Sequence, residues 1–446
     1  MSRLRVAFYG DDFTGASDNA AQYSRHGLRS ILFFSDPGEA RLREAALDHD
    51  VIGIAGTARS TATARMRIEL APVFASLKAL NAPLMQYKCC STFDSSPGTG
   101  SLGEAARLMR ETWPGGFVPV LAAMPEFGRY TIFGTHYAAD NGVVHRLDRH
   151  PTMSRHPVTP MLEADLRRVL VTQGFEVDRL VDYRELEREA ARVPAFADAF
   201  ASGIRAALFD AADDRQLTTA AATIWAVAQR HHVTAIASQG LGHGLGLHLR
   251  STGLIEGAPP THRLEATDRL LVFSGSCSPQ SAAQIAWAEQ HGFRGIRIAG
   301  RDLAEQGDAL DRIERDVVAA LGRGTSVVVY TASGPDDPSI AETNALFATE
   351  GVSLAERVGS VCARLLRVAI TRAGVRRLVV AGGDSSSFAM RHLGADGFTM
   401  EASHFGQNAH VGVLSSTDRQ VDGIEILLKG GQVGSAELYG IMLDGF

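Results

Sequence analysis

The sequence predicts an α/β protein with two domains, each built on a mainly parallel sheet flanked by helices. Apolar stretches such as RVAFYG, LLVFSGS and LVVAGG do not alternate with polar residues, which is typical of strands covered on both faces. Alanine-rich stretches with helical spacing, such as TTAAATIWAVAQ, lie between them. With 446 residues, the chain also exceeds the size of one ordinary core.

The expected strands follow one another through both halves of the chain. They are residues 5–10, 30–35, 50–56, 117–125, 206–211 and 233–240 in the first half, and 270–276, 294–300, 326–334 and 378–383 in the second. Residues 251–268 combine glycine, paired proline and polar residues, which indicates a domain boundary. We therefore expect one domain over residues 1–255 and another over residues 266–446.

Residues 133–161 interrupt this pattern with three prolines and several histidines, and we expect a long functional loop there. A helix is expected to begin where the loop ends. Thr159 suits an N-cap, Pro160 suits the first helical position, and Glu163 and Asp165 suit the positive end of a helix.

The segment 149–156, RHPTMSRH, belongs to the same irregular region. The spacing of its histidines matches no metal-binding signature. Two interpretations stay open: the segment folds over a substrate and directs Arg155 inward, or it lies on the surface.

Charge and cysteine usage exclude several classes of partner. A formal net charge of −6 argues against a nucleic-acid-binding protein or a membrane-surface protein. No apolar run reaches the roughly 18 residues that a membrane span needs. The four cysteines show no CxxC spacing and two are adjacent, which favours reduced thiols and a cytoplasmic location. The sequence leaves the oligomeric state open, with a homodimer among the alternatives.

The clearest nucleotide-type signal lies in the second half, where Gly382, Gly383, Asp384 and Ser385 follow a strand and open a helix. Such a turn offers unpaired backbone N–H groups at a helix N-terminus, which suit an anionic phosphate. The alternative is an ordinary strand-to-helix turn with an N-cap serine.

Two further turns strengthen the phosphate interpretation. One holds Ser276 and Ser278 after a strand, and the other places Lys429 directly before Gly430 and Gly431. Lysine is rare here, with three in the whole chain, so a lysine in a glycine turn is notable. Together the turns predict one nucleotide pocket at the carboxyl ends of a sheet. Neither a Walker P-loop nor a dinucleotide fingerprint occurs, which weakens an NAD(P)-dependent oxidoreductase.

Paired aspartates, Asp11 and Asp12, follow the first strand. One aspartate is enough to cap the next helix, so the second needs another explanation. Three alternatives stay open: the carboxylates bind the hydroxyls of a ligand, hold a magnesium ion, or accept a proton from an attacking hydroxyl.

A second polar segment in the first half combines a rare lysine with many hydroxyls. Lys88 ends an apolar stretch, and Ser91, Thr92 and Asp94 follow in a loop. This composition suits a small, anionic, hydroxylated molecule. Arg59, at the end of another strand, could pair with a carboxylate.

These motifs together resemble the four-carbon acid sugar kinase family. GDDFTGASD near the start, YK…ST at residues 87–92, GSCS at 275–278, AGGDSS at 381–386 and LKGGQVG at 428–434 occur in order over essentially the whole chain. The resemblance implies two α/β domains, a sugar acid in the first, ATP with Mg²⁺ in the second, and an active site in the cleft between them. It implies transfer of the γ-phosphoryl group of ATP to a hydroxyl of the acid.

The resemblance and the turn chemistry together assign the candidate residues. The catalytic candidates are Asp11, Asp12 and Lys88; the substrate-binding candidates are Arg59, Ser91, Thr92, Asp94 and Arg155; the nucleotide-binding candidates are Ser276, Ser278, Gly382, Gly383, Asp384, Ser385, Gly430 and Gly431. Either aspartate could be the base, and the sequence identifies no metal ligands.

The chain departs from the usual family loop, which resembles K-x-D-S-T-x-R-G. Here Cys90 stands in place of the aspartate, and Asp94–Ser95 in place of the arginine and glycine. The segment YKCCSTFDSSP is more similar to the branch that resembles 3-oxo-isoapionate kinases, so this acid is the expected substrate. The alternatives are a kinase for 3-oxo-tetronate, threonate or erythronate, and a catalytically silent sugar-acid sensor.

Overall fold

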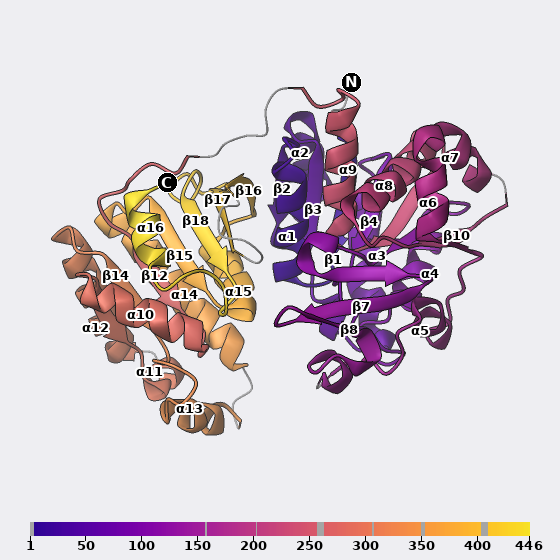
Figure 1. The fold of residues 1–446 in the computed structure, drawn as a ribbon. Coiled ribbons are helices and arrows are strands. Elements are labelled where there is room, and N and C mark those ends of the chain that lie inside the picture. Colours follow the sequence, from indigo (N-terminus) through magenta and orange to yellow (C-terminus); the bar gives the residue numbers. More distant parts are fainter. Residues whose placement is uncertain are drawn as a thin grey trace. The chain divides into compact units, whose positions relative to one another are not determined.

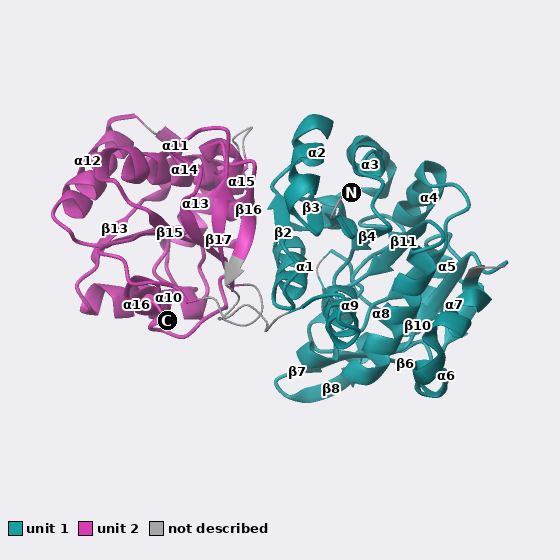
Figure 2. Cartoon of the chain, turned by 90° about the horizontal axis from the view of Figure 1, so that it is seen from above, with its two compact units in different colours: residues 1–260 teal, residues 261–446 magenta. Residues whose placement is uncertain are grey.

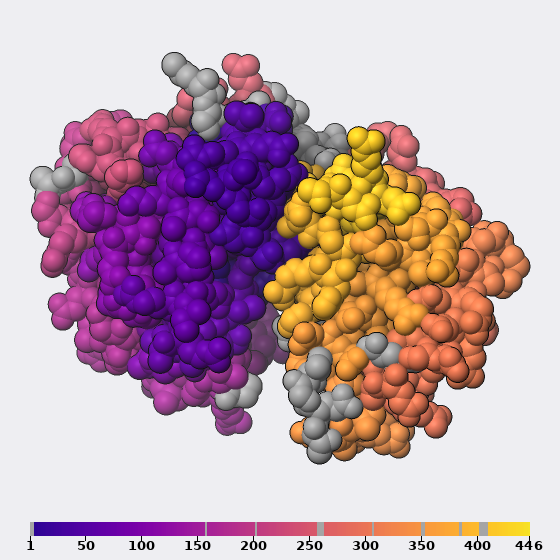
Figure 3. Space-filling model, turned by 180° about the vertical axis from the view of Figure 1, so that it is seen from behind, coloured from indigo at the N-terminus to yellow at the C-terminus, as the bar shows by residue number. Residues whose placement is uncertain are grey.

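The computed structural model describes residues 4–156, 158–201, 203–256, 263–305, 307–348, 353–402 and 409–446. For residues 201, 383–385, 401 and 402 it describes the backbone only. The chain forms two compact units, Met1–Pro260 and Thr261–Phe446 (Figures 1 and 2). Figure 3 shows the surface of the first unit largely in indigo to magenta and that of the second largely in orange to yellow.

The first unit is built on a parallel sheet with the strand order β2-β3-β1-β4-β11-β5-β10-β9. Its strands are β1 (Val6–Gly10), β2 (Ser30–Phe33), β3 (Val51–Ala55), β4 (Leu84–Lys88), β5 (Val118–Leu121), β9 (Arg179–Val181), β10 (Ala206–Phe209) and β11 (Val233–Ala237). β1 pairs with both β3 and β4, and Gly10 lies opposite Ala55 and Lys88. The residues that follow these three strands therefore meet at one edge of the sheet.

Helices cover both faces of this sheet. They are α1 (Phe13–Ser24), α2 (Glu39–Asp48), α3 (Thr63–Lys78), α4 (Leu102–Thr112), α5 (Leu166–Thr172), α6 (Tyr183–Glu189), α7 (Val193–Ala201), α8 (Asp214–Ala228) and α9 (Gly240–Ser251). Apolar side chains of α2 to α5 pack with alternate strand residues such as Tyr9, Phe33 and Ile54 into one core on one face. α1 and α8 contact strands as well. The predicted sheet flanked by helices is confirmed.

The expectation of one long loop over residues 133–161 is wrong. Strands β6 (Arg129–Ile132), β7 (Thr135–Asp140) and β8 (Val143–Arg146) form a separate antiparallel sheet. Asn141 and Gly142 connect β7 to β8 with φ angles of 46° and 80°. An Asn-Gly pair is a strong hairpin signal, because both positions of such a turn need a positive φ.

The helix expected at Thr159 begins later. α5 starts at Leu166, and the carboxylate of Asp165 caps it by accepting a hydrogen bond from the Arg167 N–H. Thr159 instead donates its own N–H, at 3.0 Å, to Nδ1 of His156. The prediction of Thr159 as the N-cap is wrong. Asp165, six residues later, has equally good capping chemistry and takes that position.

The second unit has its own sheet, in the order β13-β14-β12-β15-β18-β17-β16. Its strands are β12 (Leu271–Ser274), β13 (Arg294–Arg297), β14 (Val327–Tyr330), β15 (Arg377–Ala381), β16 (Gly397–Ala402), β17 (Ala409–Ser415) and β18 (Glu425–Lys429). Five neighbouring strands are parallel, namely β13, β14, β12, β15 and β18. At the β18 end of these, β17 and β16 continue the sheet in antiparallel pairing.

Helices also flank the second sheet. They are α10 (Pro279–Gln290), α11 (Gly300–Glu305), α12 (Gly307–Gly322), α13 (Ser339–Phe347), α14 (Leu354–Ala373), α15 (Gly383–Leu393) and α16 (Leu438–Asp444). α10 and α16 share one core with strand residues such as Val272, Val379 and Leu427. No helix within the described ranges is both long and apolar enough to cross a membrane.

Candidate active site

The site of the first unit forms where the chain leaves β1, β3 and β4. The Asp11 N–H donates to the Lys88 carbonyl at 3.1 Å, and the Arg59 N–H donates to the Asp11 carbonyl at 3.0 Å. Arg59 lies in the short 3-10 helix η1 (Ala58–Ser60) directly after β3. Backbone hydrogen bonds therefore hold three candidate residues together at one edge of the sheet.

Arg59 is paired with aspartates of the chain itself. Its Nη2 lies 2.7 Å from Asp11 Oδ1 and 2.6 Å from Asp12 Oδ1, and its Nε lies 3.9 Å from Asp94 Oδ2. The guanidinium charge is thus already balanced within the protein. The sequence predicts that Arg59 pairs with a carboxylate. In the structure, its partners are these three aspartates of the same chain.

The two aspartates differ in exposure and contacts. The Asp11 side chain is 3% exposed, and Arg59 donates hydrogen bonds to both of its oxygens. The Asp12 side chain is 29% exposed. Its Oδ1 caps α1 by accepting the Gly15 N–H at 3.1 Å, so the capping interpretation holds for Asp12. Among the described residues, the other oxygen of Asp12, Oδ2, receives no hydrogen bond.

Gly15 marks the point where these groups converge. A Cβ on this residue would lie 2.4 Å from Asp12 Oδ1, 2.7 Å from Lys88 Nζ and 3.3 Å from Arg59 Nη2. Only a glycine therefore leaves room for the close approach of a carboxylate, an ammonium and a guanidinium. The side chain of Lys88 is buried with them.

The loop after β4 adds a third carboxylate. Asp94 is buried, and its Oδ1 accepts a hydrogen bond from the Thr92 hydroxyl at 2.8 Å. Burial opposes the ionisation of Asp94, but Arg59 and the Thr92 hydroxyl outweigh it and hold the pKa of Asp94 below its usual value. Thr92 and Asp94 thus lie beside Arg59, as a common substrate site requires.

His136 on β7 anchors this loop and was not predicted. Its Nε2 lies 2.7 Å from the Ser91 carbonyl, and its Nδ1 lies 3.0 Å from the Thr131 hydroxyl. Burial lowers the pKa of His136 to about 4, so the imidazole is neutral near pH 7. The hairpin therefore supports the polar loop. No local sequence motif indicates this role of His136, and only its contact with the Ser91 carbonyl shows it.

Arg155 does not join this group. It lies in the 3-10 helix η4 (Met153–Arg155), and its side chain is exposed. No ion pair of Arg155 with Asp11, Asp12 or Asp94 exists among the described residues. Arg155 thus lies on the surface, whereas His150 and Met153 of the same segment are buried.

We expect the stability of Asp11→Asn relative to wild type to increase between pH 4 and pH 8. Burial raises the pKa of Asp11 from 3.8 to about 6, against the pull of Arg59. The contribution of the protonated carboxyl to stability is present below pH 4 and is lost as the pH rises through 6. Asparagine keeps the neutral form at every pH. Unfolding of both proteins at pH 4, 6 and 8 measures the difference in stability, and a difference that stays the same at all three pH values would contradict this expectation.

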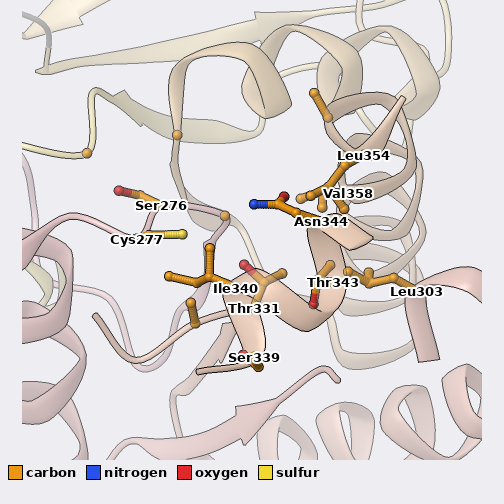
Figure 4. A pocket seen from close by; sticks show the side chains of 15 residues that line it. Ser276, Cys277, Leu303, Thr331, Ser339, Ile340, Thr343, Asn344, Leu354 and Val358 are labelled. Atoms are coloured by element: carbon orange, nitrogen blue, oxygen red, sulfur yellow. The ribbon is translucent and has the colours of Figure 1, made fainter. Parts of the chain in front are cut away.

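The turns of the second unit line a cavity of about 460 Å³. Ser276, Gly382 and Gly431 contribute to its wall, as predicted from the glycine and serine turns (Figure 4). A Cβ on Gly431 would lie 2.1 Å from Ser276 Oγ, so only glycine lets the two turns approach each other. Gly382 has a φ of 133° and precedes α15.

Ser278 has a capping role beside this cavity. Its hydroxyl accepts the Ser281 N–H at 3.0 Å, which caps α10, and donates to the Gly431 carbonyl at 2.5 Å. Ser278 therefore caps α10 and also joins two of the turns. Gly430 lies beside Gly431 and is not itself part of the wall. Gly383, Asp384 and Ser385 open α15, but the side chains of Asp384 and Ser385 lie outside what the structure describes.

Lys429 is a buried cation next to this cavity. Its carbonyl accepts the Gly382 N–H at 3.0 Å, and its side chain is buried. Nζ finds no hydrogen-bond partner among the described residues. Burial lowers the pKa of Lys429 from 10.5 to about 8. A buried ammonium that has no acidic partner among the described side chains, in a strand that leads into a glycine turn of the cavity wall, is compatible with an anion nearby.

The opposite wall of the cavity was not predicted. It consists of side chains from α11, α13 and α14, namely Leu303, Ile340, Thr343, Asn344, Leu354, Ala355 and Val358. In sequence, these residues belong to amphipathic helices and look like ordinary core residues. Their common function as a wall depends on tertiary packing.

Comparisons with known proteins cover both units of the chain. A sugar-binding N-terminal domain matches residues 6–245, and a nucleotide-binding C-terminal domain matches residues 271–438. A 3-oxo-isoapionate kinase of Paraburkholderia graminis is 40% identical over 99% of this chain and 94% of its own length. A 3-oxo-tetronate kinase of Pseudomonas savastanoi is 28% identical over 98% of this chain and 96% of its own.

A solved structure extends the similarity to the fold. The crystal structure of a Haemophilus influenzae protein covers 98% of this chain and 100% of its own, with a TM-score of 0.75 and 25% sequence identity. The chain therefore belongs to the four-carbon acid sugar kinase family, in which a sugar-binding N-terminal domain precedes a nucleotide-binding C-terminal domain.

Proposed function

We propose that this chain transfers the γ-phosphoryl group of ATP to a hydroxyl of 3-oxo-isoapionate. The observation that carries the proposal is the pairing of two unlike sites in one chain. The first unit gathers carboxylates, hydroxyls and Lys88 at the end of β1, and the second has a cavity lined by glycine and serine turns. The choice of acid follows the Paraburkholderia graminis relative, which is 40% identical over nearly the full chain.

In the proposed reaction, the oxygen of a substrate hydroxyl forms a bond to the γ-phosphorus of ATP. The bond from this phosphorus to the β–γ bridging oxygen breaks, and ADP leaves with that electron pair. The hydroxyl proton passes to Asp12, whose Oδ2 receives no hydrogen bond from the part of the chain that the structure describes, while Oδ1 is held by Gly15 and Arg59. Asp11 is buried against Arg59 and orients it.

Lys88 is a cation of this site that forms no ion pair with another described residue. Arg59 is already paired with three aspartates, whereas Lys88 lies beside Gly15 at the same place. We assign to Lys88 the role of steadying the substrate carboxylate or the phosphoryl group in transfer. Arg59 keeps Asp12 and Asp94 in position.

Mg²⁺ fits this proposal as a companion of ATP. No group of three or more acidic, histidine or cysteine side chains among the described residues could hold a metal ion by itself. Magnesium needs no such cage, because it commonly binds phosphate oxygens, waters and one or two carboxylates. Because Asp12 Oδ2 is assigned to the proton, phosphate oxygens and waters would supply the ligands of the ion in this proposal. When bound, the ion would neutralise phosphate charge.

3-Oxo-tetronate is the second candidate substrate, since several curated relatives with 28–29% identity carry that name. Threonate and erythronate remain alternatives from the sequence. Membership of a kinase family argues against the NAD(P)-dependent oxidoreductase. An active site between the domains, a homodimer and a cytoplasmic location stay predictions.

A coupled ADP-release assay over a panel of acids tests the proposal. The panel contains 3-oxo-isoapionate, 3-oxo-tetronate, threonate and erythronate, each with the full chain, ATP and Mg²⁺. We expect the highest kcat/KM with 3-oxo-isoapionate. Turnover only with another acid would overturn the substrate, and thermal stabilisation by ATP and acid without ADP release would favour a silent sensor.

A further inference from the structure

The nucleotide cavity has two chemically different sides. Glycine and serine residues, including Ser276 and Gly431, form one side, and apolar side chains of Leu303, Leu354 and Val358 form the other. Figure 4 shows Ser276 and Cys277 opposite Leu303, Thr343, Leu354 and Val358. A nucleotide has the same polarity, with an anionic phosphate end and a flat apolar base.

The apolar side belongs to elements that converge on the end of β14. Leu303 and Val358 are buried, whereas α13 presents partly exposed residues to the cavity. A buried carboxylate holds the start of α13 in place: Asp337 accepts hydrogen bonds from Arg297 Nη2 at 2.6 Å and from the Ser339 N–H at 3.0 Å. The wall formed by α13 is therefore fixed in relation to the sheet.

Asn344 is the amide in this wall. It lies on α13 and lines the cavity, and Figure 4 shows its amide group directed into the cavity between the two sides. Its side chain makes no hydrogen bond to another described residue. Asn344 is exposed, and its amide lies among both apolar side chains and the hydroxyl of Thr343, so it is available to a ligand.

We propose that Asn344 reads the edge of the adenine base and makes the cavity selective for adenine over guanine nucleotides. This inference rests on the proposed function, because it assumes that the cavity binds ATP. An amide can accept a hydrogen bond from the exocyclic amine of adenine and donate one to N7 beside it, whereas both positions on this edge of guanine are acceptors. Guanine has a carbonyl oxygen at the position of that amine, so the amide oxygen of Asn344 loses its donor. The base then lies against Leu303, Leu354 and Val358, and the phosphates lie at the glycine turns.

The test compares ATP with GTP in the full chain and in Asn344→Ala. We expect wild type to prefer ATP by at least tenfold in kcat/KM, and Asn344→Ala to lose most of this preference through a lower value for ATP. Glu342→Gln is the matched control, because Glu342 is an exposed residue of α13 outside the cavity wall. This control should behave as wild type.

Two results would overturn the inference. A variant that loses the same factor with ATP and GTP would place the amide on the ribose or phosphates, and an unchanged ATP preference would remove Asn344 from recognition. If no acid is phosphorylated, the proposed function fails separately. The preference for adenine over guanine is then measured as the difference between the thermal shifts that ADP and GDP produce. The proteins compared are wild type, Asn344→Ala and Glu342→Gln.

Discussion

Replacing Asp12 with asparagine is expected to lower kcat by about 10²–10⁴-fold, with little change in thermal stability. The amide keeps an oxygen for the Gly15 N–H and for Arg59, and asparagine is as good an N-cap as aspartate. It cannot accept the proton of the substrate hydroxyl at the position of Oδ2. Steady-state kinetics with saturating ATP and acid, together with thermal unfolding, measure both effects.

Asp213→Asn is the matched control for Asp12. Asp213 caps α8 through the Gln216 N–H at 2.8 Å, as Asp12 caps α1, but it lies outside the group around Arg59. Loss of activity in this control as well would indicate a general effect of cap substitution. Wild-type turnover by Asp12→Asn would remove Asp12 from the role of base.

Replacing Lys429 with methionine is expected to stabilise the protein and to weaken ATP binding. The lowered pKa of Lys429 means that burial of the charged ammonium costs the native state about 3 kcal/mol at pH 7, so methionine should gain about 1–3 kcal/mol. Because the native pKa is below the unfolded one, the stability of wild type rises as the pH increases from 8 to 10.5. The gain from methionine should therefore shrink over that range.

The ATP affinity of Lys429→Met should fall by about tenfold or more, because a cation beside the glycine turns is lost in a medium of low dielectric constant. Adenosine, which lacks phosphates, should bind to both proteins equally. Titration of ATP and adenosine in wild type, Lys429→Met and Lys78→Met measures this. Lys78 is the matched control, because it donates to the Thr112 carbonyl on the exposed surface of the first unit. Equal ATP affinity in all three proteins would mean that Lys429 has no role at the phosphates.

The strands and their turns could be predicted because their signals are local. Apolar runs ending in glycine, such as that before Gly10, indicate parallel strands without knowledge of their neighbours. The hairpin of β7 and β8 has a local signal in Asn141 and Gly142, but the prolines and histidines that follow it are typical of a loop and give the opposite signal. The start of α5 could not be predicted, because Thr159 and Asp165 have similar capping chemistry and only one of them caps the helix.

The sequence predicts which residue types form the candidate site, but it does not predict which of these side chains pair with one another. Carboxylates and lysine at strand ends predict a polar site. Nothing local shows that Arg59 is shared by three aspartates or that His136 supports Ser91. These contacts join positions that are far apart in sequence, and only the register of the strands brings them together. The role of Asn344 is hidden for the same reason.

The central claim is that this chain moves a phosphoryl group from ATP to a sugar acid. Mass spectrometry of the products formed by the full chain from ATP, Mg²⁺ and freshly prepared 3-oxo-isoapionate tests it most directly. We predict an acid heavier by one phosphoryl group and an equal amount of ADP, with neither product in Asp12→Asn over the same time. Unmodified acid together with intact ATP, or ADP with inorganic phosphate alone, would contradict the claim.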